Sequence, residues 1–138
     1  MNFSEYLQNN IVYLDGGMGT LLQAQGLKPG EHPERWNVSN PNIITDIHKA
    51  YYDAGSNVVC TNTFGANVLN FSESELEDII SAAVQNAKRA RDLSVSKNEK
   101  FIALDIGPTG KLLKPLGDLD FENAVSVFAK TIEIGAAQ

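Results

Sequence analysis

The chain has 138 residues, of which 43% are hydrophobic and 20% are charged, and its formal net charge is −6 at pH 7. These values predict one globular domain, and the acidic balance argues against a protein that binds nucleic acid. The polar N-terminus is unlike a secretory signal, no apolar stretch approaches the roughly 18 residues of a membrane span, and the single cysteine predicts no disulfide framework and a cytoplasmic location.

The first predicted strand is the apolar run Ile11–Leu14, which is short and rich in β-forming residues. A short helical turn at 18–25 follows it. Residues 26–40 contain two of the five prolines, which predicts a loop. A loop of that length inside a domain is more often functional than idle.

The second unit begins with a predicted helix from Pro41 to about Ala54. Asn40 is a suitable N-cap, Pro41 suits the first helical position, and Gly55 is a typical C-terminal stop. The apolar residues with helical spacing on one face are Ile44, Ile47, Tyr51 and Ala54.

Two further strands and two further helices complete the pattern. The second strand is predicted at Asn57–Thr61, and a long helix begins near Ser74, whose spacing from Glu77 is typical of a capping box. The third strand is predicted at Phe101–Ile106. A last helix begins near Phe121. Its apolar side is predicted to consist of Ala124, Val125, Phe128 and Ile132.

The alternation of strands and helices, without hairpin signals, predicts an α/β fold with parallel strands and right-handed crossovers. Two architectures remain open at this point, a doubly wound open sheet and a (β/α)8 barrel. Both bind ligands at the carboxyl ends of the strands. Here those ends carry the polar, glycine-containing segments DGG, TNTFG and DIGPTG, which predicts a binding rim at one edge of the sheet.

The segment DGGMGT at 15–20 does not match a phosphate-binding loop, because it lacks the G-x-G-x-x-G spacing and begins with an acid. Asp15 suits a ligand that carries an ammonium group. Gly16 and Gly17 allow close approach of the backbone, whose amides can bind a carboxylate. Together these groups predict a zwitterionic amino acid as ligand. The alternative is that Asp15 caps the next helical turn and that the glycines serve only the backbone conformation.

Three segments carry a resemblance to a known family: LDGGMGTLLQ, the run from ERWN to TNTFGAN, and ALDIGPTG. They resemble the first part of the homocysteine S-methyltransferase family, including the homocysteine-binding module of cobalamin-dependent methionine synthases. The resemblance implies a (β/α)8 barrel of about 300 residues. Residues 1–138 would then be its N-terminal portion, the first three strand–helix units of an incomplete barrel, truncated before the zinc-ligand region.

The resemblance also implies the reaction and a set of binding residues. The reaction is transfer of a methyl group to the zinc-activated thiolate of homocysteine, which gives methionine. Asp15 would receive the amino group, Phe64 would form an apolar wall, and Trp36 would lie over the mouth near the methyl donor. The alternative for Trp36 is a buried anchor for its loop. The remaining residues implied to line the amino-acid pocket are Gly16, Gly17, Thr61, Asn62 and Thr63.

Cofactors and partners follow from the same resemblance. The family binds zinc through three cysteines late in the barrel, and Cys60 does not match them, so this piece is predicted to hold no catalytic residue and no metal ligand. Cys60 and His48 are expected to be packing residues. The methyl donor is expected to be methylcobalamin or methyltetrahydrofolate, bound by downstream modules. Exposed strand edges predict self-association of the piece.

Secondary candidates and rival functions complete the expectations. His32 has a better claim to ligand contact than His48, and Asp105 and Thr109 are weaker rim candidates. The leading hypothesis is a methyltransferase fragment that is inactive alone. One rival is a stand-alone, flavodoxin-like ligand-binding module. A second rival is a nucleotide-dependent enzyme that uses the GPTG loop.

Overall fold

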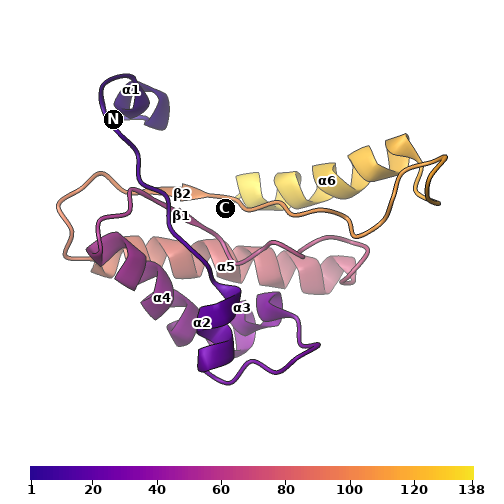
Figure 1. The fold of residues 1–138 in the computed structure, drawn as a ribbon, viewed down its shortest axis with the longest axis horizontal. Helices are drawn as coiled ribbons and strands as arrows, with labels where there is room; N and C mark the ends of the chain where they lie inside the picture. The colour runs from indigo at the N-terminus through magenta and orange to yellow at the C-terminus, as the bar shows by residue number, and fades with distance from the viewer.

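The structure is a computed structural model that describes residues 1–138. Two parallel strands lie at its centre. Strand β1 (Val58–Cys60) pairs with β2 (Phe101–Ala103), and Val59 lies opposite Ile102. Helix α5 (Glu73–Leu93) connects them, and Figure 1 shows it running along the strands. The parallel α/β arrangement predicted from the sequence is therefore confirmed.

The predicted first strand, Ile11–Leu14, does not form a regular strand. It runs parallel to β1 through a single bridge between Leu14 and Val58, and the amide of Asp15 donates to the carbonyl of Val58 at 2.9 Å. Ile11 is 75% exposed and Leu14 is 65% exposed. Because few side chains pack on this edge of the sheet, the backbone of residues 11–14 runs beside β1 without forming a regular ladder of hydrogen bonds.

The other two strands are shorter than predicted at their carboxyl ends. The amide of Thr61 still donates to the carbonyl of Ala103 at 2.9 Å. Beyond that point the amide of Asp105 donates to the hydroxyl of Thr61 at 3.1 Å. Side chains thus replace the backbone ladder where the strands end, which opens this edge of the sheet.

The predicted helices are present near the expected positions, but the structure also contains helices that were not predicted. The predicted loop at 26–40 contains a 3-10 helix and a short α-helix, and the polar N-terminus forms a helix that the sequence analysis missed. None of the helices has the length and hydrophobicity that a membrane span requires. The remaining bounds are α1 Phe3–Asn9, α2 Gly19–Ala24, η1 Pro33–Arg35, α3 Trp36–Ser39, α4 Pro41–Asp53 and α6 Phe121–Ala136.

Two predicted helix caps differ from the observed ones. Helix α5 begins at Glu73, because the hydroxyl of Ser72 accepts from the amide of Glu75, so the cap lies two residues before the predicted one at Ser74. Asn40 precedes α4 as predicted, but its side chain makes no capping hydrogen bond. Its φ of −134° and ψ of 53° do not direct the side chain to the first amides of the helix.

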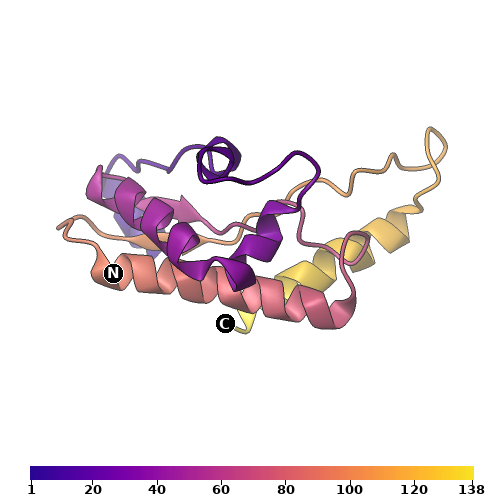
Figure 2. The ribbon, with the colours of Figure 1, turned by 90° about the horizontal axis from the view of Figure 1, so that it is seen from below.

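The core lies between α5 and the elements on either side of it. The apolar stripe of α5 is buried along its whole length and consists of Leu76, Ile79, Ile80, Ala83, Val84, Ala87 and Ala90. Tyr52 of α4 and Val59 of β1 pack with Ala87 and Ala90 of α5. Tyr52 also donates its hydroxyl proton to the carbonyl of Phe101 at 2.7 Å, which links α4 to β2. Figures 1 and 2 show α4 lying along α5 from two directions.

The predicted buried faces of α4 and α6 are wrong in part. On α6, Val125, Phe128 and Ile132 are 36% to 46% exposed, while the buried residues are Ala124, Val127, Thr131 and Ile134. On α4, the buried residues are Ile44, Thr45, His48 and Tyr52. Figure 1 shows the reason for α6, which lies at the edge of the molecule with α5 on one side only. Its smaller residues pack inward, and its more apolar stripe faces outward.

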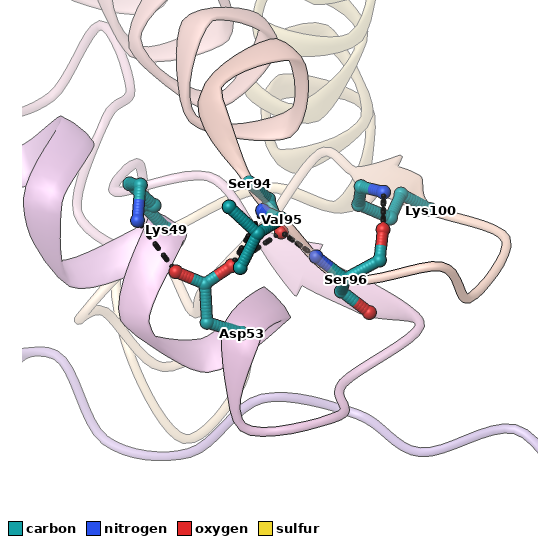
Figure 3. Close-up of polar contacts among 6 residues, drawn as sticks. All are labelled: Lys49, Asp53, Ser94, Val95, Ser96 and Lys100. Atoms are coloured by element: carbon teal, nitrogen blue, oxygen red, sulfur yellow. Dashed lines mark hydrogen bonds and ion pairs between the residues drawn. The ribbon is translucent and has the colours of Figure 1, made fainter.

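Asp53, the last residue of α4, ties this helix to the connection between α5 and β2. Its carboxylate accepts hydrogen bonds from the hydroxyl of Ser94 at 2.6 Å and from the amide of Val95 at 3.0 Å, and it pairs with Lys49 (Figure 3). These partners lower the pKa of Asp53 to about 2, with the hydrogen bonds from Lys49 and Ser94 as the largest causes. The connection is thereby fixed at the end of the molecule opposite the strand tips.

Candidate functional site

A cavity of about 450 Å³ opens where the strands end. Its walls come from the glycine loop after Leu14, from residues 32–34, from the segment after β1, and from Asp105 after β2. The three polar segments that the sequence placed at one edge of the sheet therefore contribute to a common space, except that the third contributes Asp105 alone. The volume is typical of a site for a small ligand.

Most of the predicted binding residues line this cavity, and one does not. Trp36 lies outside the lining and packs against the cluster formed by Leu22, Leu27 and Ile44. This position matches the alternative in which Trp36 anchors its loop. Phe64 is 60% exposed at the mouth. The predicted residues that do line the cavity are Asp15, Gly16, Gly17, Thr61, Asn62, Thr63 and Phe64.

Asp15 is held at the end of the first parallel segment. Its Oδ2 accepts a hydrogen bond from the amide of Cys60 at 2.8 Å, which leaves Oδ1 without a partner in the chain. The residue that precedes α2 is Met18, and no side chain caps that helix. The alternative in which Asp15 caps the next helical turn is therefore wrong, and Oδ1 of the carboxylate accepts no hydrogen bond from a backbone amide.

The glycine loop is fixed from outside by Tyr51 of α4. The Tyr51 hydroxyl donates to the carbonyl of Gly17 at 2.7 Å, and a Cβ at Gly16 would lie 2.9 Å from the same hydroxyl oxygen. Partial burial and the charge of Asp15 raise the pKa of Tyr51. The amides of Gly16 and Gly17 donate no hydrogen bond within the chain. The helical spacing placed Tyr51 on an apolar face, and its hydroxyl was the only signal of this second role.

The segments after β1 and β2 are joined by a ring of hydrogen bonds. The amide of Asp105 donates to the Thr61 hydroxyl, the Thr61 hydroxyl lies 2.7 Å from that of Thr63, and the Thr63 hydroxyl donates to the Asp105 carbonyl at 2.7 Å. Both threonines are almost fully buried. Their hydroxyls therefore build the cavity wall. Thr109, by contrast, bonds only within its own turn to Lys111 and does not line the cavity.

A close backbone contact joins the same two segments. The amide of Gly107 donates to the carbonyl of Phe64 at 3.1 Å. A Cβ at Gly107 would lie 2.2 Å from that carbonyl oxygen, so only glycine fits at this position. The carboxyl group of Asp105 has a raised pKa, caused first by burial and then by the charges of Asp15 and Glu34.

Three buried asparagines attach residues 32–37 to the strand tips. Asn37 donates to the carbonyl of Asn62 at 2.7 Å, and Asn62 donates to the Pro33 carbonyl at 2.9 Å and to Oδ1 of Asn37 at 3.1 Å. Asn86 of α5 donates to the carbonyl of Asn37 at 3.0 Å. Because buried polar groups that are fully paired give a rigid arrangement, this network fixes one wall of the cavity.

Glu34 is a cavity residue that the sequence analysis missed. It is 4% exposed, and its Oε1 accepts a hydrogen bond from the amide of Gly65 at 2.6 Å. Its Oε2 is buried and has no partner. His32, which the sequence favoured over His48 for ligand contact, also lines the cavity, with its ring 4.9 Å from that of Phe71. The signal for Glu34 was an acid inside a polar loop that the structure folds against the TNTFG segment.

The residues of this chain do not fit a zinc site. Burial, followed by the charge of Asp15, raises the pKa of Cys60 to about 12, so the neutral thiol is favoured and not the thiolate that binds metal. No three side chains of His, Cys, Asp or Glu are placed to hold one ion. His48 lies in the α4 helix, fully buried and outside the cavity lining.

Comparisons with known proteins show which family the chain resembles. The methionine synthase of Mycobacterium tuberculosis is 30% identical over 128 residues, which cover 85% of this chain and 11% of that protein. The methionine synthase of Mycobacterium leprae is also 30% identical over 128 residues, which cover 10% of that protein. The chain thus spans about a tenth of the curated relatives that it matches.

Solved structures of the homocysteine methyltransferase MmuM from Escherichia coli share the fold. The metallated form has a TM-score of 0.79 at 22% identity, with 95% of this chain and 52% of that chain covered. The apo form has a TM-score of 0.74 at 25% identity, with 95% and 47% covered. The family model described as homocysteine S-methyltransferase matches residues 12–138, from the glycine loop to the last helix. The chain therefore belongs to the homocysteine S-methyltransferase family.

Proposed function

We propose that residues 1–138 form the amino-acid-binding portion of a homocysteine S-methyltransferase domain of the methionine synthase type. In this proposal they are the first three strand–helix units of a (β/α)8 barrel. The family match over 12–138 and the similarity to methionine synthases support it. The single observation that carries it is the cavity at the strand ends, which combines an acid with unpaired backbone amides.

The two ends of homocysteine suit two different parts of this cavity. Oδ1 of Asp15 accepts a hydrogen bond from the ammonium group, because it is the carboxylate oxygen left free by Cys60. The amides of Gly16 and Gly17 donate to the carboxylate of the ligand. A charge-assisted hydrogen bond of this kind contributes about 1–3 kcal/mol. Phe64, exposed at the mouth, offers an apolar surface to the side chain of the ligand.

The chemical step needs groups that this part of the chain does not supply. In our proposal the metal ion, zinc in this family, is held by residues outside 1–138, and methylcobalamin or methyltetrahydrofolate acts through other modules. The existence of a metallated form of MmuM and the similarity to methionine synthases support this division. We accordingly expect residues 1–138 alone to bind the amino acid without transferring a methyl group, and we place the protein in the cytoplasm.

The test is a methyl-transfer assay on the full-length product of the gene, supplied with zinc and L-homocysteine. Methylcobalamin, methyltetrahydrofolate, betaine and S-methylmethionine are compared as donors, and methionine is measured. Methionine formed with any of them supports the proposal. L-homocysteine binding without transfer from any donor would favour the rival ligand-binding module, and absence of both would refute the assignment of the cavity.

A further inference from the structure

Glu34 holds a buried carboxylate oxygen that nothing in the chain satisfies. The residue sits in η1, is 4% exposed and lines the cavity at the strand ends. One oxygen, Oε1, accepts from the amide of Gly65, and the other, Oε2, is buried without a partner. Buried polar atoms in folded proteins are nearly always paired, so an unpaired carboxylate oxygen at a cavity wall indicates a partner that enters from the cavity.

The position of this carboxylate is fixed on both sides. Its segment is held by the hydrogen bonds between Asn37 and Asn62 and between Asn62 and Pro33. On the other side, a Cβ at Gly65 would lie 2.8 Å from Oε1, so glycine is what allows the short contact with the amide. Glu34 therefore belongs to a rigid wall of the cavity, and its carboxylate is held in place on both sides.

The charge of the cavity indicates which partner fits. Asp15, Glu34 and Asp105 line it, His32 is the only basic side chain in the lining, and neither lysine nor arginine contributes. The acids are near enough to affect one another, since the charges of Asp15 and Glu34 both raise the pKa of Asp105. Because no lysine or arginine in the lining balances them, the acids favour a ligand that brings a positive charge and N–H donors.

We propose that Glu34 is a second recognition residue for the ammonium group of the amino acid, with Oε2 accepting one of its N–H donors. The inference rests on the proposed function, because it assumes the same ligand in the same cavity. An ammonium group has three donors, and Oδ1 of Asp15 accepts another of them. Glu34 and Asp15 together make the cavity selective for the α-amino group over analogues that lack it.

The test compares two ligands in calorimetry with the full-length protein that contains this chain. L-homocysteine carries the ammonium group, and 4-sulfanylbutanoate is the same molecule without it. Glu34→Gln keeps one oxygen that can accept from the amide of Gly65. It replaces the unpaired oxygen by an NH2 group, which is a donor and cannot accept a hydrogen bond from ammonium. We expect Glu34→Gln to weaken L-homocysteine binding at least tenfold and to change 4-sulfanylbutanoate binding less than twofold. The matched control is Glu31→Gln, because Glu31 is an exposed acid of the same loop outside the cavity lining.

The outcomes separate the inference from the function on which it rests. Equal weakening of both ligands by Glu34→Gln would mean that Glu34 only holds Gly65, and it would overturn the inference. Unchanged L-homocysteine binding would overturn it as well. If the wild-type protein binds no L-homocysteine, the proposed function fails and this inference fails with it. The amide signal of Gly65 in NMR spectra reports whether the loop is intact in the variant.

Discussion

His48 makes the stability of the fold depend on pH in a direction that the structure determines. Its side chain is fully buried on α4, and neither ring nitrogen has a hydrogen-bond partner. Burial lowers the pKa of His48 from 6.5 to about 4. The folded chain therefore keeps the ring neutral at pH values where the unfolded chain binds a proton.

The sign and size of the effect follow from this difference in pKa. Well above pH 6.5 the ring of His48 is neutral in both states, so its titration does not change the free energy of unfolding there. As pH falls from 6.5 towards 4 the unfolded state gains a proton that the folded state does not, so stability is lost. At about 1.4 kcal/mol per pH unit, the loss between pH 7 and pH 4.5 amounts to about 2–3 kcal/mol.

The assay is urea unfolding of the wild type and of His48→Leu at pH 7 and pH 4.5. Leucine removes the titrating group and the two unpaired nitrogens, so we expect equal or higher stability at pH 7 and a pH-dependent loss smaller by about 2–3 kcal/mol. Ile44→Leu is the control, because it changes another buried residue of α4 that carries no titrating group and should keep the wild-type pH dependence. If His48→Leu loses as much stability as the wild type between the two pH values, the reasoning is refuted.

Three further predictions follow from the site and its surroundings. Asp15→Asn should weaken L-homocysteine binding by about 1–3 kcal/mol in calorimetry, and equal binding by both proteins would remove Asp15 from its role. Gly107→Ala should lower the free energy of unfolding by about 2 kcal/mol or more in urea, because its Cβ would lie 2.2 Å from the carbonyl oxygen of Phe64; an unchanged midpoint would show that the two segments can separate freely. Residues 1–138 should self-associate in sedimentation experiments. Phe128→Lys on the outward stripe of α6 should reduce the self-association, while the exposed control Gln85→Lys should not. A wild-type monomer at high concentration would contradict the prediction.

The order and direction of the strands could be predicted because they depend on local patterns. The run Val58–Cys60 is apolar and β-branched, and the long helix after it shows a clear buried stripe. Parallel strands then bring their carboxyl ends to one edge, which is why Asp15 and Asn62 were expected close together and line the same cavity.

The details that the sequence did not reveal depend on what packs against each element. Phe128 and Val127 are both apolar, and only the position of α6 against α5 decides which of them is buried. In the sequence Glu34 is one acid among several in a polar loop, and only the folded loop brings its carboxylate to the amide of Gly65. In the same way, the hydroxyl of Tyr51 donates to the carbonyl of Gly17, which is 34 residues away in the sequence.

The ring of hydrogen bonds between Thr61, Thr63 and Asp105 also limits how the cavity can adapt. Each hydroxyl proton in it is committed in one direction, from the Asp105 amide round to the Asp105 carbonyl. Neither threonine hydroxyl is then free to donate to a ligand. Recognition of the ligand therefore depends on the carboxylates and on the unpaired amides of the glycine loop. We therefore expect the pocket to discriminate between ligands by the placement of their charges.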